Sequence, residues 1–292
     1  MFKTFQYKTH GIERLSFIYG QKLYRALVNK NCNFFLKPTD IISHRPTLAG
    51  YHEAHLESFF RQAAQTHQDF FLDIGANIGL TSGLVGDQFT YVDCVEPNEL
   101  VLNILKTNLA LNLTKARLSI HHLALAKEAG DLSLTVPLDN FGGAYIAQDN
   151  PQFASGQHAF SEQQKVFTTS VRAENAEVWL KAKFQDYQEK KLSKGVIKID
   201  VEGYDQFILQ SIFNTLPEQL SVIIVLENWF KYFPVSDFTS SHRLSWFHFK
   251  KQLNLWHSIV SKLLGGHSTY AYKMVPLTDE TYKPRDCCVY CD

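Results

Sequence analysis

Residues 71–79 read Phe-Leu-Asp-Ile-Gly-Ala-Asn-Ile-Gly, an apolar run that ends in a turn with glycine at both ends. Gly75 and Gly79 let the backbone turn tightly and come close to another group, where a Cβ would collide. An apolar strand before the turn and a helical pattern from about Leu80 predict a strand-turn-helix unit. This stretch therefore favours an α/β domain with a ligand site at the turn.

Strand-like and helix-like segments continue to alternate on both sides of this unit. The expected strands are 91–96, 118–122, 195–200 and 222–226, and the expected helices are 99–111 and 206–216. Such alternation is typical of a parallel sheet with crossover helices. Residues 131–136 either continue the sheet or open a hairpin, and the polar stretch 139–164 is expected to be a loop near the active site.

The ends of the chain suggest a cap and an insertion. We expect a helical N-terminal cap over 1–68 and a Rossmann-like domain over 69–292, with an aromatic-rich insertion at about 229–264. Residues 269–275 and 287–291 are candidates for a closing hairpin. Five cysteines without disulfide-like spacing are expected to be plain thiols, and a zinc site near the C-terminus is the weaker alternative.

Glu96 ends the strand that follows the turn, 23 residues after Asp73. An acid at this place in an α/β sheet accepts hydrogen bonds from both ribose hydroxyls of a nucleoside. The pattern D-x-G-x-N-x-G lacks the G-x-G-x-x-G fingerprint of dinucleotide sites. Asp73 suits a cationic ligand, because a carboxylate attracts an ammonium or a sulfonium. A turn without any ligand is the structural alternative.

A second group of charged residues, Lys198, Asp200 and Glu202, ends a later strand. Alternation along the strand places Lys198 and Asp200 on one side, at the sheet edge where ligands bind. Asp200, and next Glu202, are candidates to accept the proton of a hydroxyl acceptor. Lys198 is expected to keep a carboxylate ionised or to contact the acceptor. Alternatively, the acids cap the next helix or, with Glu227, hold Mg²⁺; nothing in the sequence requires a metal.

These segments together resemble the FkbM family of methyltransferases. The resemblance covers roughly residues 45–230 and is carried by 50–53, 71–79 with Thr81 and Ser82, 95–98, Asn108 and Asn112, 197–203 with Leu209, and 225–227. Asp205 stands where relatives often have Glu. Residues 139–144 look like the family's glycine-rich loop.

The resemblance implies an α/β class I methyltransferase fold with a seven-stranded, mostly parallel sheet. It implies S-adenosylmethionine as the cofactor and methyl transfer to a hydroxyl group. The expected cofactor-binding residues are Asp73, Gly75, Ala76, Asn77, Gly79, Glu96, Pro97, Asn98 and Asp200. The expected catalytic residues are Asp200, Glu202 and Lys198.

The composition of the chain limits the kinds of partner that we expect. With 29 basic and 29 acidic residues the chain has no net charge, which argues against a nucleic-acid-binding protein. No apolar run is long enough for a transmembrane helix, and the charged start is unlike a signal peptide, so we expect a cytoplasmic protein. The acceptor is expected to be a hydroxylated small molecule or a glycan, and the aromatic insertion suits an acceptor pocket, a homo-oligomer interface or plain packing. The alternatives are a nicotinamide-dependent oxidoreductase and a non-catalytic nucleoside-binding scaffold.

Overall fold

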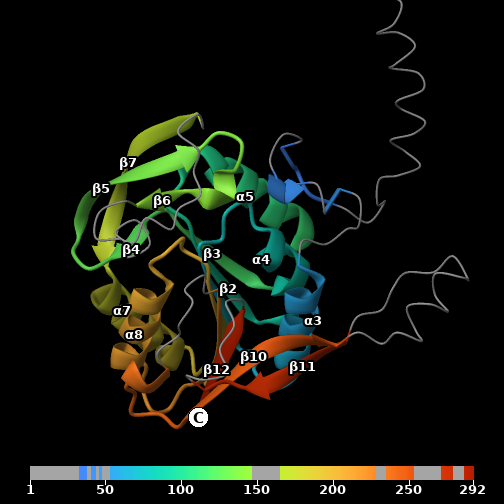
Figure 1. Ribbon diagram of the computed structural model, residues 1–292, viewed down its shortest axis with the longest axis vertical. Coiled ribbons are helices and arrows are strands. Elements are labelled where there is room, and N and C mark those ends of the chain that lie inside the picture. The colour runs from blue at the N-terminus through green and yellow to red at the C-terminus, as the bar shows by residue number, and fades with distance from the viewer. Residues whose placement is uncertain are drawn as a thin grey trace, which may run out of the picture.

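The structure is a computed structural model that describes residues 33–37, 41–43, 46–47, 53–146, 165–227, 235–252, 271–278 and 286–292. Two sheets organise these residues (Figure 1). The larger sheet has eight strands in the order β11-β10-β12-β9-β8-β1-β2-β3, and the smaller sheet has four in the order β4-β7-β5-β6.

The centre of the large sheet is parallel. β1 (Phe70–Ile74) lies between β2 (Tyr91–Val95) and β8 (Lys194–Ile199), and β3 (Arg117–His121) and β9 (Ser221–Leu226) flank them. Five neighbouring strands therefore end at the same edge, with Asp73, Glu96, Asp200 and Glu227 at or just beyond their carboxyl ends.

Antiparallel strands extend the sheet beyond β9. β12 (Cys287–Cys291) pairs with β9 and with β10 (Leu244–Gln252), which in turn pairs with β11 (Ala271–Pro276). The expected hairpin between the last two strands is wrong, because β10 lies between them and supplies the hydrogen bonds to both. The cysteines Cys94, Cys287, Cys288 and Cys291 are buried free thiols.

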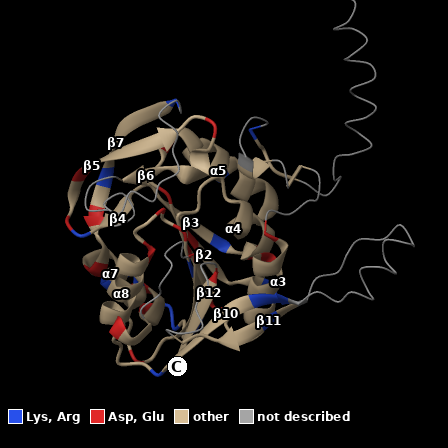
Figure 2. Ribbon diagram, viewed as in Figure 1, with Lys and Arg blue, Asp and Glu red and all other residues tan. Residues whose placement is uncertain are grey.

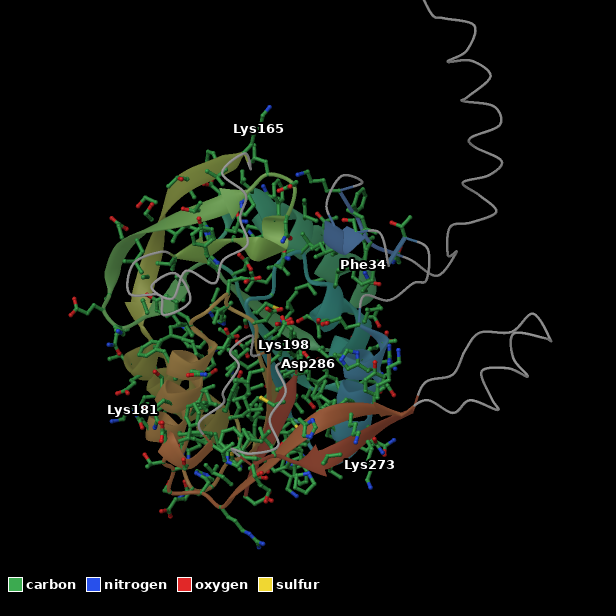
Figure 3. The ribbon with its side chains drawn as sticks, viewed as in Figure 1. Phe34, Lys165, Lys181, Lys198, Lys273 and Asp286 are labelled. Carbon is green, nitrogen blue, oxygen red and sulfur yellow. The ribbon has the colours of Figure 1, made fainter. Side chains whose placement is uncertain are left out.

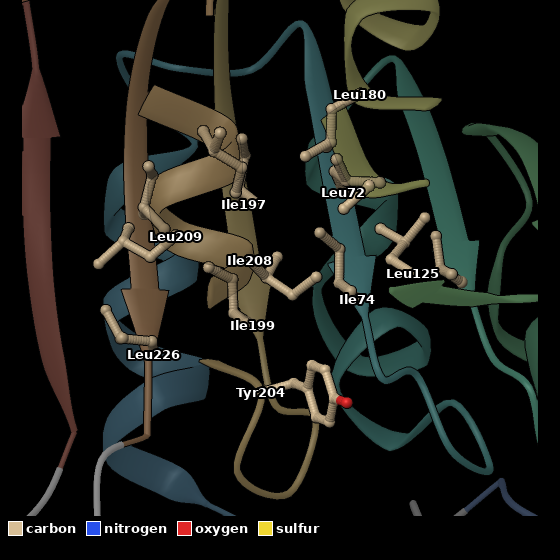
Figure 4. Close-up of a cluster of buried hydrophobic side chains, with 14 of the residues drawn as sticks. Leu72, Ile74, Leu125, Leu180, Ile197, Ile199, Tyr204, Ile208, Leu209 and Leu226 are labelled. Atoms are coloured by element: carbon tan, nitrogen blue, oxygen red, sulfur yellow. The ribbon is translucent and has the colours of Figure 1, made fainter. Parts of the chain in front are cut away.

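Helices cover both faces of the large sheet (Figure 1). α7 (Ala176–Glu189) and α8 (Asp205–Thr215) pack on the face that carries Phe70, Leu72 and Ile74. Figure 4 shows part of this layer, where Leu180 and Ile208 meet Leu72 and Ile74. α3 (Ala54–Ala63), α4 (Leu80–Val85) and α5 (Glu99–Asn112) lie on the other face, against Phe71 and its neighbours. Period-two alternation along each strand explains the two separate apolar layers.

The smaller sheet stands beside the ligand edge of the larger one. It consists of β4 (Ala124–Ala126), β5 (Gly130–Pro137), β6 (Tyr145–Ile146) and β7 (Val166–Asn175). Residues 131–136 do not continue the main sheet. The expected hairpin is confirmed, because β5 pairs antiparallel with β6, the next strand in the sequence, and also with β7. Short 3₁₀ helices occur at Ile41–Ser43, Gly86–Gln88, Phe141–Gly143 and Val235–Asp237.

The expected fold class is confirmed. The chain has an α/β fold with a large, mostly parallel sheet covered by crossover helices. The expected count of seven strands is wrong, because β11 adds an eighth at the edge beyond β10. In the part of the chain described, no helix is both long and apolar enough to span a bilayer.

The division into a cap and a domain remains a prediction. Of the expected cap 1–68, α3 and a few shorter pieces lie within the described residues; the helix-like pattern near residues 13–28 lies outside them. Of the segment 229–264, residues 244–252 form β10 and so belong to the main sheet.

Candidate functional site

Two adjoining cavities open at the carboxyl ends of β1, β2, β8 and β9. We call the first the Glu96 cavity, after the buried carboxylate in its wall. We call the second the carboxylate cavity, because Glu53, Asp200, Glu202 and Glu227 line it. Both cavities include Gly75, Asn77, Gly142, Asp200 and Glu202. A ligand can therefore extend from one into the other along the turn that follows β1.

The Glu96 cavity has a largely apolar wall and three carboxylates, Glu96, Asp200 and Glu202, of which Glu96 is buried. Its apolar lining comes from β1, β2, the segment 123–125, β5, the segment 141–146 and Tyr204. Burial raises the pKa of the Glu96 carboxyl to about 7, although hydrogen bonds from the Asn98 and Asn77 amides oppose the shift. Such a cavity suits a flat apolar ring next to a group that donates hydrogen bonds.

Glu96 is fixed by the two loops on either side of it. Its Oε2 accepts a hydrogen bond from the backbone N–H of Asn77 (2.7 Å), and its Oε1 accepts one from the N–H of Asn98 (2.8 Å). The Asn98 side chain accepts from the N–H of Leu100 and so caps α5. A carboxylate has about four acceptor sites, so two remain after these bonds. The carboxylate is thus held in place with capacity for a ligand.

Backbone geometry explains why the turn after β1 has its sequence. Asn77 has φ +50°, a left-handed conformation that asparagine tolerates better than most residues. Gly75 has φ +85°, and a Cβ there would collide with the carbonyl oxygen of Asp200. Gly79 has φ +78° at the start of α4, and its Cβ would lie 2.8 Å from Leu105. Both glycines are therefore required by the packing of the protein itself.

Asp73 lies behind the cavities and lines neither of them. It is fully buried, its Oδ2 accepts a hydrogen bond from Ser82 Oγ (2.6 Å), and its Oδ1 lies 3.3 Å from Lys198 Nζ. Burial raises its pKa, and the charge of Lys198 opposes that shift. The structure therefore pairs this carboxylate with a lysine of the neighbouring strand, whereas the sequence suggested a cationic ligand.

Lys198 joins two carboxylates. Its Nζ lies 3.0 Å from Asp200 Oδ2 in addition to 3.3 Å from Asp73 Oδ1, and the side chain is 8% exposed. Burial by itself lowers the pKa of this ammonium, but the charges of Asp200 and Asp73 raise it above its usual value. The predicted placement of Lys198 and Asp200 on one side of the strand is confirmed, with Ile197 and Ile199 in the apolar layer opposite.

The acidic residues that follow β8 have two different roles. α8 begins at Asp205, and the Asp205 carboxylate accepts hydrogen bonds from the N–H groups of Val201 (3.3 Å) and Gly203 (3.2 Å). Asp200 and Glu202 instead line both cavities. Asp205 therefore fixes the loop that carries Asp200 and Glu202, and neither of these acids caps α8, whose N-cap Tyr204 makes no side-chain capping bond.

The carboxylate cavity holds acids whose charges repel one another. Burial and the charge of Asp200 raise the pKa of Glu202 to about 8, and burial with Asp200 and Asp286 raises that of Glu227 to about 9. Burial with Asp286 and Asp200 raises the pKa of Glu53 to about 7. Figure 2 shows the Asp and Glu residues of the described chain in red and its Lys and Arg residues in blue. Within the described residues, no group of three or more His, Cys, Asp or Glu has the arrangement of a metal site.

The predicted residues occupy different positions around these cavities. Gly75, Asn77, Asp200 and Glu202 line both; Glu96 and Pro97 line the first; Ala76 and Lys198 line the second; Asp73, Gly79 and Asn98 support them from behind. Sequence reasoning assigned no role to Glu53, although it belongs to the FkbM-like segment 50–53. It also missed the apolar wall made by segment 123–125, since apolar residues carry no functional signature in one sequence, whereas segment 141–146 belongs to the stretch 139–164 that was expected near the active site.

No family model and no curated protein matches this sequence. Similar solved structures include a putative O-methyltransferase from Klebsiella pneumoniae, at 10% identity and TM-score 0.41, covering 94% of this chain and 96% of that one. An O-methyltransferase from Bacillus cereus in complex with SAH is similar at 12% identity and TM-score 0.36, covering 98% and 92%. A precorrin-8w decarboxylase from Methanobacterium thermoautotrophicum is similar at 10% and 0.38, covering 89% and 97%. The activity is inferred below from the two cavities alone.

Proposed function

We propose that this protein is an S-adenosylmethionine-dependent methyltransferase that methylates a hydroxyl oxygen of a small molecule or glycan. The observation that carries the proposal is the Glu96 carboxylate in its apolar cavity, with one oxygen fixed by the Asn77 amide and the other by the Asn98 amide. The two acceptor sites that remain match the two hydroxyls of a ribose.

The surroundings of Glu96 fit a nucleoside with a polar tail. The apolar wall from segments 123–125 and 141–146 suits the adenine ring. The side-chain oxygen of Asn77 is buried without a hydrogen-bond partner among the described residues, which favours a ligand that donates a hydrogen bond. Gly142 makes room for this asparagine, because a Cβ there would lie 2.8 Å from Asn77 Nδ2.

The cofactor supplies an already activated methyl group, so the protein has to orient the acceptor and handle one proton. Asp200 is the candidate for orienting the acceptor hydroxyl, since Lys198 holds its carboxylate in place at 3.0 Å. Glu202 lies in the same cavities, and its pKa of about 8 suits a group that exchanges a proton near neutral pH. Lys198 acts through Asp200, by holding that carboxylate in position.

The test is a calorimetric titration of the purified protein with S-adenosylmethionine, S-adenosylhomocysteine and NADH. We expect both sulfur nucleosides to bind and NADH not to bind. Glu96→Ala should abolish the binding, whereas Glu99→Ala, an exposed acid in the first turn of α5, should leave it unchanged. Binding of NADH alone would instead support a nicotinamide-dependent oxidoreductase.

Turnover is tested separately. Formation of S-adenosylhomocysteine is measured with a panel of sugars and hydroxylated metabolites, in the wild type and in Asp200→Asn. We expect Asp200→Asn to lose turnover but still to bind S-adenosylmethionine. Binding without turnover on any acceptor would favour the nucleoside-binding scaffold.

A further inference from the structure

The positive charge available inside the carboxylate cavity is already matched. Lys198, the one Lys or Arg among the described residues that line it, lies 3.0 Å from Asp200 and 3.3 Å from Asp73. None of the ion pairs between described residues involves Glu53 or Glu227. The cavity therefore has an excess of carboxylates over cations.

Independent polar atoms in the same walls also require hydrogen-bond donors. The side-chain oxygens of Asn77 and Asn140 are buried without a hydrogen-bond partner among the described residues, and both residues line the carboxylate cavity. Carboxylates and amide oxygens are all acceptors. The cavity is thus suited to a ligand that carries positive charge and N–H or O–H groups, and unsuited to an anion.

The charges around each glutamate come from several elements. Glu53, beside the first turn of α3, is near Asp286, Asp200, Lys198 and His55. Glu227, which follows β9, is near Asp200, Asp286, Glu53 and Glu202.

Asp286 has a close partner of its own. Its Oδ2 lies 2.7 Å from His55 Nε2, and His55 stacks on Tyr272 at 4.7 Å. Figure 3 labels Lys198 and Asp286 in the middle of the molecule. Near the glutamates of the cavity, Lys198 is thus paired with two acids, and Asp286 is paired with His55.

We propose that the carboxylate cavity distinguishes the sulfonium of the methyl donor from the uncharged thioether of the product. Glu53, Glu202 and Glu227 give up protons when the charged donor binds and take them back when the neutral product forms. This inference rests on the proposed function, and it assigns a selective role to glutamates rather than to Asp73, whose charge Lys198 already balances.

The proton balance of methyl transfer is consistent with this role. The bond from carbon to sulfur breaks, the bond from carbon to the acceptor oxygen forms, and the hydroxyl releases one proton. The sulfonium charge disappears in the same step, so a carboxylate that was ionised beside it regains affinity for a proton. A glutamate of the cavity can therefore receive the hydroxyl proton, and no further reagent is needed.

The test is the ratio of the dissociation constants of S-adenosylhomocysteine and S-adenosylmethionine between pH 6 and pH 9.5. A cation binds better to ionised carboxylates, and the pKa values of the three glutamates lie between about 7 and about 9. The ratio should therefore rise with pH, by about tenfold for each unit by which the sulfonium lowers these pKa values. Glu53→Gln and Glu227→Gln should each flatten the rise.

The control is Glu57→Gln on the same helix as Glu53, whose partner is Arg61 at the surface. Titrations in phosphate and in Tris at pH 7.5 should show that the wild type releases more protons with S-adenosylmethionine than each cavity variant does. A wild-type ratio that stays constant with pH would overturn the inference, whether or not the variants fold. An unchanged rise in both variants would overturn it too, whereas failure of both nucleosides to bind would contradict the proposed function itself.

Discussion

Lys198 Nζ lies 3.3 Å from Oδ1 of Asp73, a carboxylate with no exposed surface. The pair crosses from β8 to β1, and the same ammonium reaches Asp200 at 3.0 Å. Asp73 therefore anchors the lysine that holds Asp200 at the cavities. This relationship changes the expected role of Asp73 from contacting a cationic ligand to supporting a residue that lines the site.

We expect Lys198→Met to destabilise the protein by about 3–5 kcal/mol, because it leaves the buried Asp73 without its counter-charge. Asp73→Asn combined with Lys198→Met should recover much of that loss, since the fully buried charge is then removed and Asp200, which also loses its lysine, is 41% exposed. Urea unfolding of the two single variants and the double variant measures the coupling. Additive effects of the two substitutions would contradict a direct interaction between these side chains.

Two glycines that line the same cavities should respond differently to alanine. Gly142→Ala should weaken S-adenosylmethionine binding without a large loss of stability, because its Cβ meets the movable end of the Asn77 side chain. Gly75→Ala should destabilise the protein by about 3 kcal/mol or more, because its Cβ meets the backbone of Asp200 at a positive φ. Calorimetric titration and thermal unfolding of both variants separate the two effects. Equal loss of stability in both would contradict the role assigned to Gly142.

Glu202 is held in a left-handed conformation with φ +42°. Glu202→Gly should therefore be more stable than Glu202→Ala by about 1 kcal/mol, since only glycine adopts this conformation without strain. Both variants lack the carboxylate and should lose methyl transfer equally. The control is Lys191→Gly, at a residue beyond α7 with φ +61°. We expect this variant to gain stability and to bind S-adenosylmethionine as the wild type does. Urea unfolding measures the stability of the three variants, and the methyl-transfer assay measures their activity.

Stability should fall as the pH rises through the range in which Glu227 titrates. The pKa of Glu227 is about 9 in the folded protein, whereas the ordinary value for a glutamate is 4.5. The folded state therefore binds the proton more tightly than the unfolded state. The free energy of unfolding then decreases with pH between about 4.5 and 9. Glu227→Gln should be more stable than the wild type at pH 9, by about 1–3 kcal/mol.

Near pH 4.5 the same substitution should have little effect, because the glutamate is then protonated when folded. Urea unfolding at pH 5, 7 and 9 makes the measurement, with Glu57→Gln as the control. A wild-type stability that is flat over this range would show that Glu227 ionises normally in the folded protein.

The sequence alone was sufficient for the parallel core and for the turn after β1. Short continuous apolar runs specify strands that are buried on both faces, and glycines at positions that need positive φ specify the turn; both are local effects. Placing Glu96 and Asp200 at the ligand edge also followed from the sequence, because parallel strands end on the same side of a sheet. The helix expected over 99–111 followed from its apolar pattern, and the structure adds the Asn98 side chain as its cap.

Only the tertiary structure decided which charges meet. Lys198 is paired with Asp73 across 125 positions of sequence and His55 with Asp286 across 231, and no local pattern encodes such distances. The sequence also did not determine the strand order at the edge of the sheet. There β10 separates β11 from β12, and pairing between distant strands depends on the whole fold. The carboxylate cavity exists because Glu53 from α3 and Glu227 from β9 are brought to Asp200 by packing. Burial and mutual repulsion, which only that packing creates, give these ordinary glutamates their raised pKa values.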